Sequence, residues 1–399
     1  MVRVEEATDL VLSHCFKPAI TRVDLNDASG RVLGEAVKAD RDFPPFDRVA
    51  MDGIAIWYDE WKNGRREFYV EQTQGAGQPQ KSLKDVQNCM EVMTGAVLPE
   101  GTDTVIRYED VSIQGNKAII LVDKVEENQN VHGQGKDARH GEVLLTPGII
   151  LSPSEIALLA SVGMTDVPVF SFPRAAIISS GDELVEVNEV PEVYQIRRSN
   201  TYAIQAAMKN IGWEGTQYHL YDQKDFVIDS LKVIAEDHDV LIVSGGVSKG
   251  KFDFIPEALE SIGVKKLFHQ VSQRPGKPFW FGTSKKGKVV FALPGNPVST
   301  YMCFYRYVFP WLWKSLHVAP TQQYAVLAED FKFNPELTYF LQVTVKNEEG
   351  RLMAYPDAGG GSGDFANLKR VTGFLELPID KDFFEAGEVF PYYPFRIQV

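Results

Sequence analysis

The amino-acid sequence predicts a multidomain α/β plus β protein with a doubly wound sheet in its central part. Residues 174–263 alternate short apolar strands with amphipathic helices, a pattern typical of a parallel sheet covered by helices on both faces. Residues 41–140 and 320–399 instead carry short alternating strands separated by Gly, Pro and Asp. Two helical stretches, 4–15 and 154–162, flank the first of these β-rich regions.

These patterns divide the 399 residues into four predicted domains. Residues 1–40 and 141–172 form a helical domain that is split by an inserted β-rich domain, residues 41–140. Residues 173–316 form the α/β domain. Residues 317–399 form a small all-β domain.

Within the α/β domain, the elements follow one another regularly from Arg174. The strand RAAIIS precedes a helix in SNTYAIQAAMKNIG, for which Ser199 or Asn200 is the expected N-cap and Gly212 the expected stop. The strand TQYHLY, the helix KDFVIDSLKVIAED, the strand DVLIV and the helix FIPEALESIG come next. Residues 299–316 are apolar but contain an arginine and a proline, and they are short for the about 20 residues of a membrane span. We therefore expect a buried helix or a subunit contact there, and no membrane association.

Composition excludes several classes of function. The net charge of −13 and the pI near 5.1 argue against a nucleic-acid partner, which requires a basic face. The three cysteines are far apart and odd in number, and the seven histidines show no metal-binding spacing. The N-terminal segment lacks the basic and apolar regions of a signal peptide, so we expect a cytoplasmic protein.

The most informative segment extends from Asp239 to Pro297. An apolar strand runs directly into Ser244-Gly245-Gly246, and two further Gly/Pro turns follow at Arg274–Pro278 and Leu293–Pro297. Ligands of open α/β sheets bind where strands end, and glycines at such turns let the backbone approach an anion. Three such turns predict a pocket for a phosphate-bearing ligand.

Two details of this segment are ambiguous. Gly245 to Lys251 has seven of the eight positions of a P-loop, but Phe252 stands where Ser or Thr would bind Mg²⁺, so the P-loop interpretation is disfavoured. Cations gather at or close before the turns, which favours local anion recognition over ordinary solvated charge. They are Arg197, Arg198, Lys249, Lys251, Arg274 and Lys277.

Eight segments in order along the chain resemble the signatures of one known family. They are FPPFDRVAMDGIAI (43–56), MTGAVLPEGTDTVIRYED (93–110), GKDARHGEVLLTPG (135–148), SSGDEL (179–184), RRSNTYAI (197–204), SGGVSKGKFD (244–253), RPGKPFWFG (274–282) and LPGNPVS (293–299). GGSGDFANLKRVTGFLELP near the C-terminal end resembles the last domain of the same family. On these segments, which cover nearly the whole chain, the protein resembles the molybdopterin molybdenumtransferases, the MoeA family that includes the E domain of gephyrin.

The resemblance implies a function. Members of this family take adenylylated molybdopterin and molybdate, release AMP and leave molybdenum on the pterin dithiolene, which is the last step of molybdenum cofactor synthesis. It also implies a doubly wound pterin-binding domain, a C-terminal β barrel, Mg²⁺ as cofactor and an elongated homodimer with a shared active site. The adenylyltransferase that makes the substrate, and molybdoenzymes or their chaperones, are the implied transient partners.

The family motifs carry candidate residues for substrate binding. For molybdate, a compact dianion held by N–H, hydroxyl and cationic donors, the resemblance implies Ser248, Arg274, Lys277 and Pro278. For the rest of the substrate it implies Ser199, Asn200, Gly245, Gly246, Pro294, Gly295, Asn296 and Pro297. Taken alone, Ser248 is more typical of a turn hydroxyl and Lys277 of a solvated lysine.

The same motifs carry candidate catalytic residues, which are Asp52, Thr94, Asp137, Glu183, Asp222 and Asp253. A hard cation with oxygen ligands would offset the charge of the pyrophosphate-like link, and Asp253 and Glu183 are its candidate ligands. We expect Asp52, Thr94 and Asp137 to reach the partner's cleft across the dimer. Backbone capping is the alternative role for Asp52 and Asp137, because such residues commonly cap turns.

Some positions depart from the family pattern. Arg274 stands where Lys is common, and Lys251 where many members carry an acid. Gln342 and Asn367 stand where Arg and Ser are expected, so they do not support contacts from the last domain to molybdate. Three alternative functions follow: the related adenylyltransferase, which lacks segments 43–56 and 93–110; a non-catalytic member of the family; and an assembly scaffold, for which we expect further domains and linkers to be needed.

Overall fold

The computed structural model describes residues 1–247, 253–319 and 321–396. The chain forms two compact units, each described separately below. Unit 1 comprises Met1–Gly34, Pro147–Pro153 and Asp166–Val399, and unit 2 comprises Glu35–Thr146 and Ser154–Thr165. The boundaries of the four domains proposed above stay a prediction.

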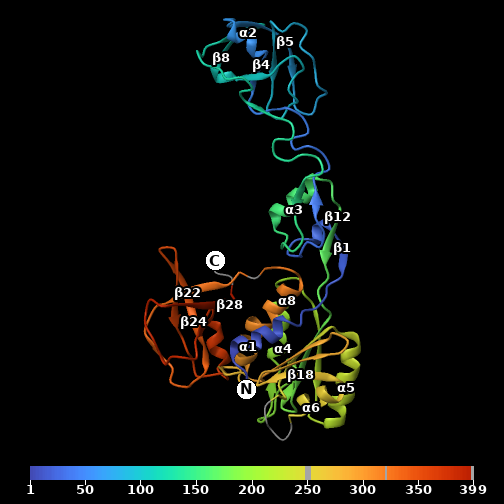
Figure 1. Ribbon diagram of the computed structural model, residues 1–399, viewed down its shortest axis with the longest axis vertical. Coiled ribbons are helices and arrows are strands. Elements are labelled where there is room, and N and C mark those ends of the chain that lie inside the picture. Colours follow the sequence, from blue (N-terminus) through green and yellow to red (C-terminus); the bar gives the residue numbers. More distant parts are fainter. Residues whose placement is uncertain (248–252, 320, 397–399) are drawn as a thin grey trace. The chain divides into compact units, whose positions relative to one another are not determined.

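The centre of unit 1 is a six-stranded sheet in the order β16-β13-β17-β21-β20-β18. Figure 1 labels its edge strand β18 and the helices α4, α5 and α6. The strands of this sheet are β13 (Ala175–Ser180), β16 (Gly215–Leu220), β17 (Val240–Ser244), β18 (Val264–His269), β20 (Trp280–Ser284) and β21 (Val289–Leu293). The first four in the spatial order are parallel to their neighbours, but β20 runs antiparallel to both β21 and β18. The parallel arrangement predicted from residues 174–263 holds for β13, β16 and β17, but it does not extend to β20, which the chain enters from β18 through residues 270–279 without a helix.

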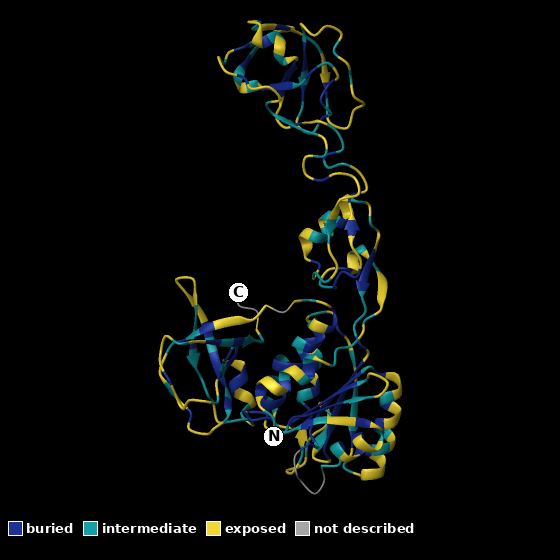
Figure 2. Ribbon diagram, viewed as in Figure 1, coloured by how far each residue is buried: buried dark blue, intermediate teal, exposed yellow. Residues whose placement is uncertain are grey.

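Helices cover both faces of this sheet, as the alternating pattern predicted. Ile177, Ile242 and Phe291 point to one face, where they pack with residues of α1 (Val4–Leu12), α4 (Asn200–Lys209), α7 (Pro297–Cys303) and α8 (Phe309–Ser315). Ile178 and Val243 point to the other face, where α5 (Lys224–Asp237) and α6 (Ile255–Ser261) pack. The strands are buried on both sides (Figure 2), which is why their sequences are apolar throughout.

The helix caps differ in detail from the expectation. Ser199 occupies the N-cap position of α4, but its side chain makes no capping hydrogen bond. Helix α6 begins at Ile255, with Phe254 at the N-cap position and Pro256 in the first turn. A proline costs no helical hydrogen bond there, because backbone N–H groups in the first turn have no partner within the helix. Helix α5 has the predicted bounds.

The apolar stretch at 299–316 forms a buried helical segment of unit 1. Helix α7 continues through a π-helix, Phe304–Val308, into α8. Trp311 and Leu312 are fully buried against the α/β sheet. Among the residues that the structure describes, none of the helices is both long and apolar enough to cross a membrane.

The C-terminal part of unit 1 is a closed five-stranded barrel with β19 (Gln273–Arg274) added at one strand. The pairings β24–β25, β25–β22, β22–β28, β28–β26 and β26–β24 close the circle. The strands are β22 (Gln323–Leu327), β24 (Thr338–Glu348), β25 (Arg351–Pro356), β26 (Gly373–Leu377) and β28 (Val389–Pro394). Leu341, Val343 and Leu375 point into the barrel core. The predicted combination of a doubly wound α/β sheet and a C-terminal barrel is confirmed.

Unit 1 also contains three short two-stranded sheets. They are β1 (Ile20–Asp24) with β12 (Asp166–Phe170), β14 (Leu184–Val185) with β15 (Ile196–Arg197), and β23 (Phe331–Lys332) with β27 (Phe383–Phe384).

Unit 2 is β-rich, with a six-stranded sheet in the order β7-β4-β6-β5-β9-β8. Its strands are β4 (Gly53–Ile56), β5 (Glu67–Gln74), β6 (Cys89–Val92), β7 (Thr104–Arg107), β8 (Val111–Gln114) and β9 (Lys117–Ile120). Its other elements are β2 (Val37–Lys38), β3 (Arg48–Val49), α2 (Tyr58–Lys62), β10 (Val131–His132), β11 (Val143–Leu145) and α3 (Pro153–Ser161). Apolar side chains such as Ile54, Phe68 and Ile106 form its core.

Candidate functional site

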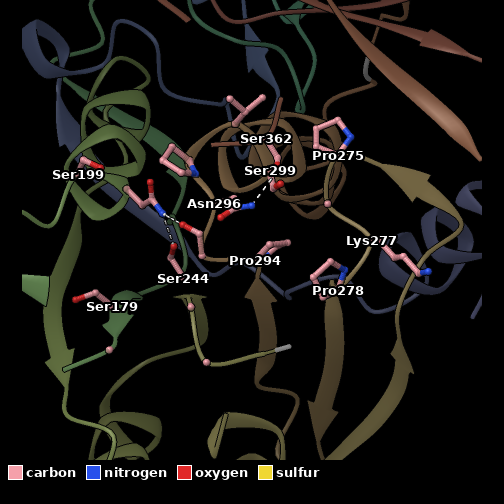
Figure 3. A pocket seen from close by; sticks show the side chains of 18 of the residues that line it. Ser179, Ser199, Ser244, Pro275, Lys277, Pro278, Pro294, Asn296, Ser299 and Ser362 are labelled. Carbon is pink, nitrogen blue, oxygen red and sulfur yellow. Dashed lines mark hydrogen bonds between the residues drawn. The ribbon is translucent and has the colours of Figure 1, made fainter. Parts of the chain in front are cut away.

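A pocket of about 670 Å³ lies at the carboxyl edge of the α/β sheet in unit 1 (Figure 3). The ends of β13, β16, β17 and β21 meet there, because the register pairs Ser180 with Leu220, and Ser244 with both Ser179 and Leu293. The antiparallel strand β20 begins at this edge, so all three Gly/Pro turns border one cavity. The predicted clustering of the turns therefore occurs in the structure.

Two glycines after β17 are required by close packing. Gly245 has φ +101°, and a Cβ there would lie 2.6 Å from the carbonyl oxygen of Ser180. Gly246 has φ +67°, and a Cβ would lie 2.6 Å from a side-chain carbon of Ile255. No other residue fits this combination of positive φ and contact, and both glycines line the pocket.

The turn Leu293–Pro297 is held from two sides. The Asn200 side-chain N–H₂ donates to the carbonyl oxygen of Gly295 at 2.7 Å and to Ser244 Oγ at 2.9 Å. On the barrel side, Asn296 donates to Ser362 Oγ at 2.8 Å (Figure 3). Asn200 and Asn296 thus fix the shape of the pocket wall through their amide groups.

The turn Arg274–Pro278 carries two exposed cations. Arg274 extends from β19, and its guanidinium lies 5.9 Å from the ring centroid of Phe333. Tyr339 pairs with Arg274 in the sheet, and burial raises the pKa of the Tyr339 phenol. Lys277 lines the opposite end of the turn and extends away from Ser244 and Asn296 (Figure 3). In the described part of the chain, neither cation is paired with a carboxylate. Both are available to an anion.

Carboxylates gather at another part of the wall. Asp222 is half-buried; Ser180 Oγ donates to its Oδ1 at 3.0 Å, and its own N–H donates to Asp182 Oδ1 at 2.9 Å. Burial raises the pKa of Asp222, and the nearby charges of Asp182 and Asp253 raise it further. The carboxylate of Glu183 folds over Gly181, where a Cβ would lie 2.6 Å from its Oε2. In the described part of the chain, Glu183, Asp222 and Asp253 therefore bring three carboxylates to this cavity.

The donor set suits Mg²⁺ in kind but is incomplete. The oxygens of Glu183, Asp222 and Asp253 are the hard ligands that this ion prefers. Among the described residues, however, no group of three or more His, Cys, Asp or Glu side chains is arranged to hold a metal ion. An ion here would complete its coordination with water or ligand oxygens, as Mg²⁺ commonly does.

Residues that were not named as catalytic or substrate-binding candidates also border the pocket. Arg198 is 8% exposed; it donates to Glu186 Oε1 at 2.5 Å and to Ser179 Oγ at 3.4 Å. Its Nε and the hydroxyl of Thr201 are buried without a hydrogen-bond partner in the described structure. Arg198 was expected only as one of several cations near the turns. Gln273, Tyr339 and Ser362 also line the pocket. Gln273 and Tyr339 lie outside the quoted motifs, and Ser362 lies in the C-terminal segment that resembles the family but was not named as a site residue.

Three predicted residues lie in unit 2. Asp52 is exposed, and its Oδ1 accepts hydrogen bonds from the Thr94 backbone N–H at 2.6 Å and from Thr94 Oγ1 at 2.7 Å. These two bonds lower the pKa of Asp52 and keep it ionised. Asp137, also exposed, has its Oδ1 2.8 Å from Nε2 of His132. Asp52 therefore makes the backbone contact that was its alternative role, and it makes a side-chain contact as well.

The predicted residues divide between the pocket and unit 2. The pocket is lined by Glu183, Ser199, Asn200, Asp222, Gly245, Gly246, Asp253, Arg274, Lys277, Pro278, Pro294, Gly295, Asn296 and Pro297. Asp52, Thr94 and Asp137 belong to unit 2. Ser248, Lys249, Lys251 and Phe252, and with them most of the P-loop-like segment, lie outside the described residues. Gln342 lines the pocket, and Asn367 is buried behind it, with Asn367 Nδ2 3.4 Å from Gln342 Oε1.

Comparison with known proteins identifies the family. Residues 2–163 match the MoeA N-terminal region (domains I and II), residues 176–314 a probable molybdopterin binding domain, and residues 324–395 the MoeA C-terminal region (domain IV). A protein of Synechocystis sp. named molybdopterin molybdenumtransferase is 42% identical over 98% of this chain and 100% of its own length. A protein of the same name from Staphylococcus epidermidis is 30% identical over 97% of this chain and 94% of its own.

A solved structure agrees with these sequence matches. The molybdopterin biosynthesis MoeA protein of Pyrococcus horikoshii superimposes with a TM-score of 0.85 at 29% identity, over 98% of this chain and 100% of that one. Together these matches show a transferase of molybdenum cofactor biosynthesis. The chain belongs to the MoeA family of molybdopterin molybdenumtransferases, so the resemblance stated from the motifs is confirmed, as is the prediction of a transferase.

Proposed function

We propose that this protein transfers molybdenum from molybdate onto adenylylated molybdopterin and releases AMP, as the last step of molybdenum cofactor synthesis. The observation that carries the proposal is the composition of the pocket wall. Three Gly/Pro turns border it, two cations without carboxylate partners among the described residues stand at one turn, and carboxylates gather near the end of β16. A ligand with a dianion and a phosphate link requires both kinds of wall.

In this proposal the cationic turn receives the oxyanion. Arg274 and Lys277 would bind molybdate with the N–H groups of the neighbouring backbone, and the turns at Gly245–Gly246 and Pro294–Pro297 would hold the pterin and phosphate parts. Ser248, the remaining molybdate candidate, lies outside the described residues. The neutral Gln342 and Asn367, which hydrogen-bond each other, would line the wall without adding charge.

The carboxylate wall would serve the phosphate link. When bound, Mg²⁺ would neutralise charge on the phosphate oxygens, with Asp253 and Glu183 as ligands and Asp222 nearby. Asp222 has a raised pKa, so it would hold or release a proton closer to neutral pH than an ordinary aspartate.

The remaining acids would come from a second subunit. We propose a cytoplasmic homodimer in which Asp52 and Asp137 of one subunit complete the pocket of the other. Asp52 and Asp137 are exposed and held by partners within unit 2, as groups presented to another surface would be. Thr94 would act through Asp52, which it keeps ionised. The enzyme that adenylylates molybdopterin would supply the substrate, and molybdoenzymes or their chaperones would take the product.

The direct test is AMP release. Purified protein is given adenylylated molybdopterin and Mg²⁺ with or without molybdate, and AMP is measured by chromatography. We expect AMP to form only when molybdate is present. Absence of AMP under these conditions, with binding of the substrate shown separately, would exclude the proposed transfer and leave a non-catalytic member of the family.

A further inference from the structure

The turn that carries Arg274 and Lys277 connects the two sheets of unit 1. On its N-terminal side, Gln273 and Arg274 form β19, which pairs in parallel with Thr338 and Tyr339 of the barrel strand β24. On its C-terminal side, the chain enters β20 of the α/β sheet. The positions of both cations therefore depend on how the apex of this turn is held.

The buried side chain of Gln273 holds the apex of this turn, Gly276. Gln273 has no exposed surface, and its Nε2 donates to the carbonyl oxygen of Gly276 at 3.0 Å. Its Oε1 accepts a hydrogen bond from the hydroxyl of Tyr307 at 2.5 Å. Both ends of the Gln273 amide are thus engaged, which fixes its orientation. Gly276, at φ +88°, packs so tightly that a Cβ would lie 2.7 Å from Cys303 Sγ.

Tyr307 is itself fixed from the barrel side. It lies in the π-helix Phe304–Val308 and is 1% exposed. Its neighbour Arg306 donates to Glu376 of β26 at 2.7 Å and lies 5.1 Å from the ring centroid of Tyr307. A π-helical turn is an irregularity that occurs frequently at functional sites. A continuous series of contacts therefore connects Glu376 of the barrel, through the π-helix, to the carbonyl of Gly276.

We propose that Gln273 and Tyr307 are positioning residues for the oxyanion site. By holding the carbonyl of Gly276, they set where the turn presents the charges of Arg274 and Lys277. Neither side chain needs to touch the anion for this role. The inference rests on the proposed function, because it assumes that this turn binds molybdate.

Molybdate affinity tests the proposal. Sodium molybdate is titrated calorimetrically into the wild type, Tyr307→Phe, Gln273→Leu and the double variant. We expect each single variant to bind molybdate about tenfold more weakly, an effect of the size that one lost hydrogen bond has. The double variant should bind no more weakly than the singles, because all three interrupt the same chain of contacts. AMP affinity should stay within about twofold, since its site does not depend on this one contact.

Two controls separate positioning from loss of folding. Tyr305→Phe removes a hydroxyl from the same π-helix, where it lies 3.5 Å from the hydroxyl of Tyr301 and outside the chain to Gln273; it should bind molybdate as the wild type does. The thermal midpoint of every variant is measured, and the double variant, which replaces both polar partners with apolar groups, should be at least as stable as the singles.

The outcomes are distinguishable. Equal molybdate affinity in the wild type and in folded Tyr307→Phe and Gln273→Leu would overturn the positioning role and leave the proposed function intact. A tenfold loss in Tyr305→Phe as well would also overturn it, because the effect would then belong to the whole helix. Failure of the wild type to bind molybdate would overturn both proposals.

Discussion

The turn Arg274–Pro278 in unit 1 and the Asp52 and Asp137 loops of unit 2 carry opposite charges and are held in different ways. The cationic turn rests on Gln273, which has no exposed surface and contacts the π-helix. The acids of unit 2 are exposed and held at one carboxylate oxygen each, by Thr94 and by His132. The cationic turn is thus fixed by buried contacts within unit 1, whereas the acids of unit 2 lie at a surface. A surface group can serve another subunit.

The largest expected effect tests this division directly. Asp52→Ala and Asp253→Ala should each abolish AMP release, because each removes a carboxylate from the proposed site. Mixing the two inactive proteins under conditions of subunit exchange should restore about a quarter of the wild-type activity, since about half of the dimers are mixed and one of their two sites keeps both carboxylates. Activity is measured as AMP release, and the dimer is checked by size-exclusion chromatography.

A dimer without recovered activity on mixing would break the comparison, because Asp52 would then act within its own chain. A matched control mixes Asp222→Ala with Asp253→Ala. Both residues line the same pocket, so no mixed dimer has an intact site and no recovery is expected.

The next effect concerns the rigidity of the cationic turn. Gly276→Ala should destabilise the protein by about 1–3 kcal/mol, because an alanine at φ +88° is strained and its Cβ would lie 2.7 Å from Cys303 Sγ. It should also weaken molybdate binding, since the turn must move. Thermal unfolding and molybdate titration measure the two effects.

Gly287→Ala provides the control for backbone strain. Gly287 has a similar φ of +79°, but nothing lies within 4 Å of its ideal Cβ. This variant should lose about 1 kcal/mol from strain alone and bind molybdate as the wild type does. Equal losses in the two variants would mean that close packing under the turn does not matter.

The turns and, through the family motifs, the domain architecture could be predicted from the sequence, but the direction of one strand and several contacts between distant side chains could not. Gly245, Gly246 and Gly276 signal their turns because positive φ and close approach are local demands that few residues other than glycine satisfy. The antiparallel direction of β20 was missed, since it depends on pairing with β18 and β21 rather than on the strand's own sequence. The same holds for side chains brought in from distant segments. Tyr307 reaches Gln273 across 34 positions and Ser362 reaches Asn296 across 66, and neither separation leaves a periodic pattern.

The smallest expected effect asks what Thr94 contributes to Asp52. Two hydrogen bonds from Thr94 lower the pKa of Asp52, so the carboxylate is ionised well below neutral pH. Thr94→Val removes the hydroxyl but keeps the backbone N–H, so the pKa of Asp52 should rise part of the way toward its ordinary value. The acid limb of the pH profile of AMP release should therefore move to higher pH. At pH 7 the rate should change less than about twofold, because the carboxylate is ionised in both proteins.

Thr94→Ser keeps the hydroxyl and should give the wild-type profile. If Thr94→Val instead lowered the rate at pH 7 more than about tenfold, Thr94 would contact the substrate itself, since the ionisation of Asp52 alone has no such effect at that pH. An unchanged acid limb in Thr94→Val would mean that the ionisation of Asp52 does not control the reaction. The first result would give unit 2 a second group acting on the substrate beside Asp52. The second would confine the role of Asp52 to holding its loop, and the contrast between a fixed cationic turn and presented acids would then rest on Asp137.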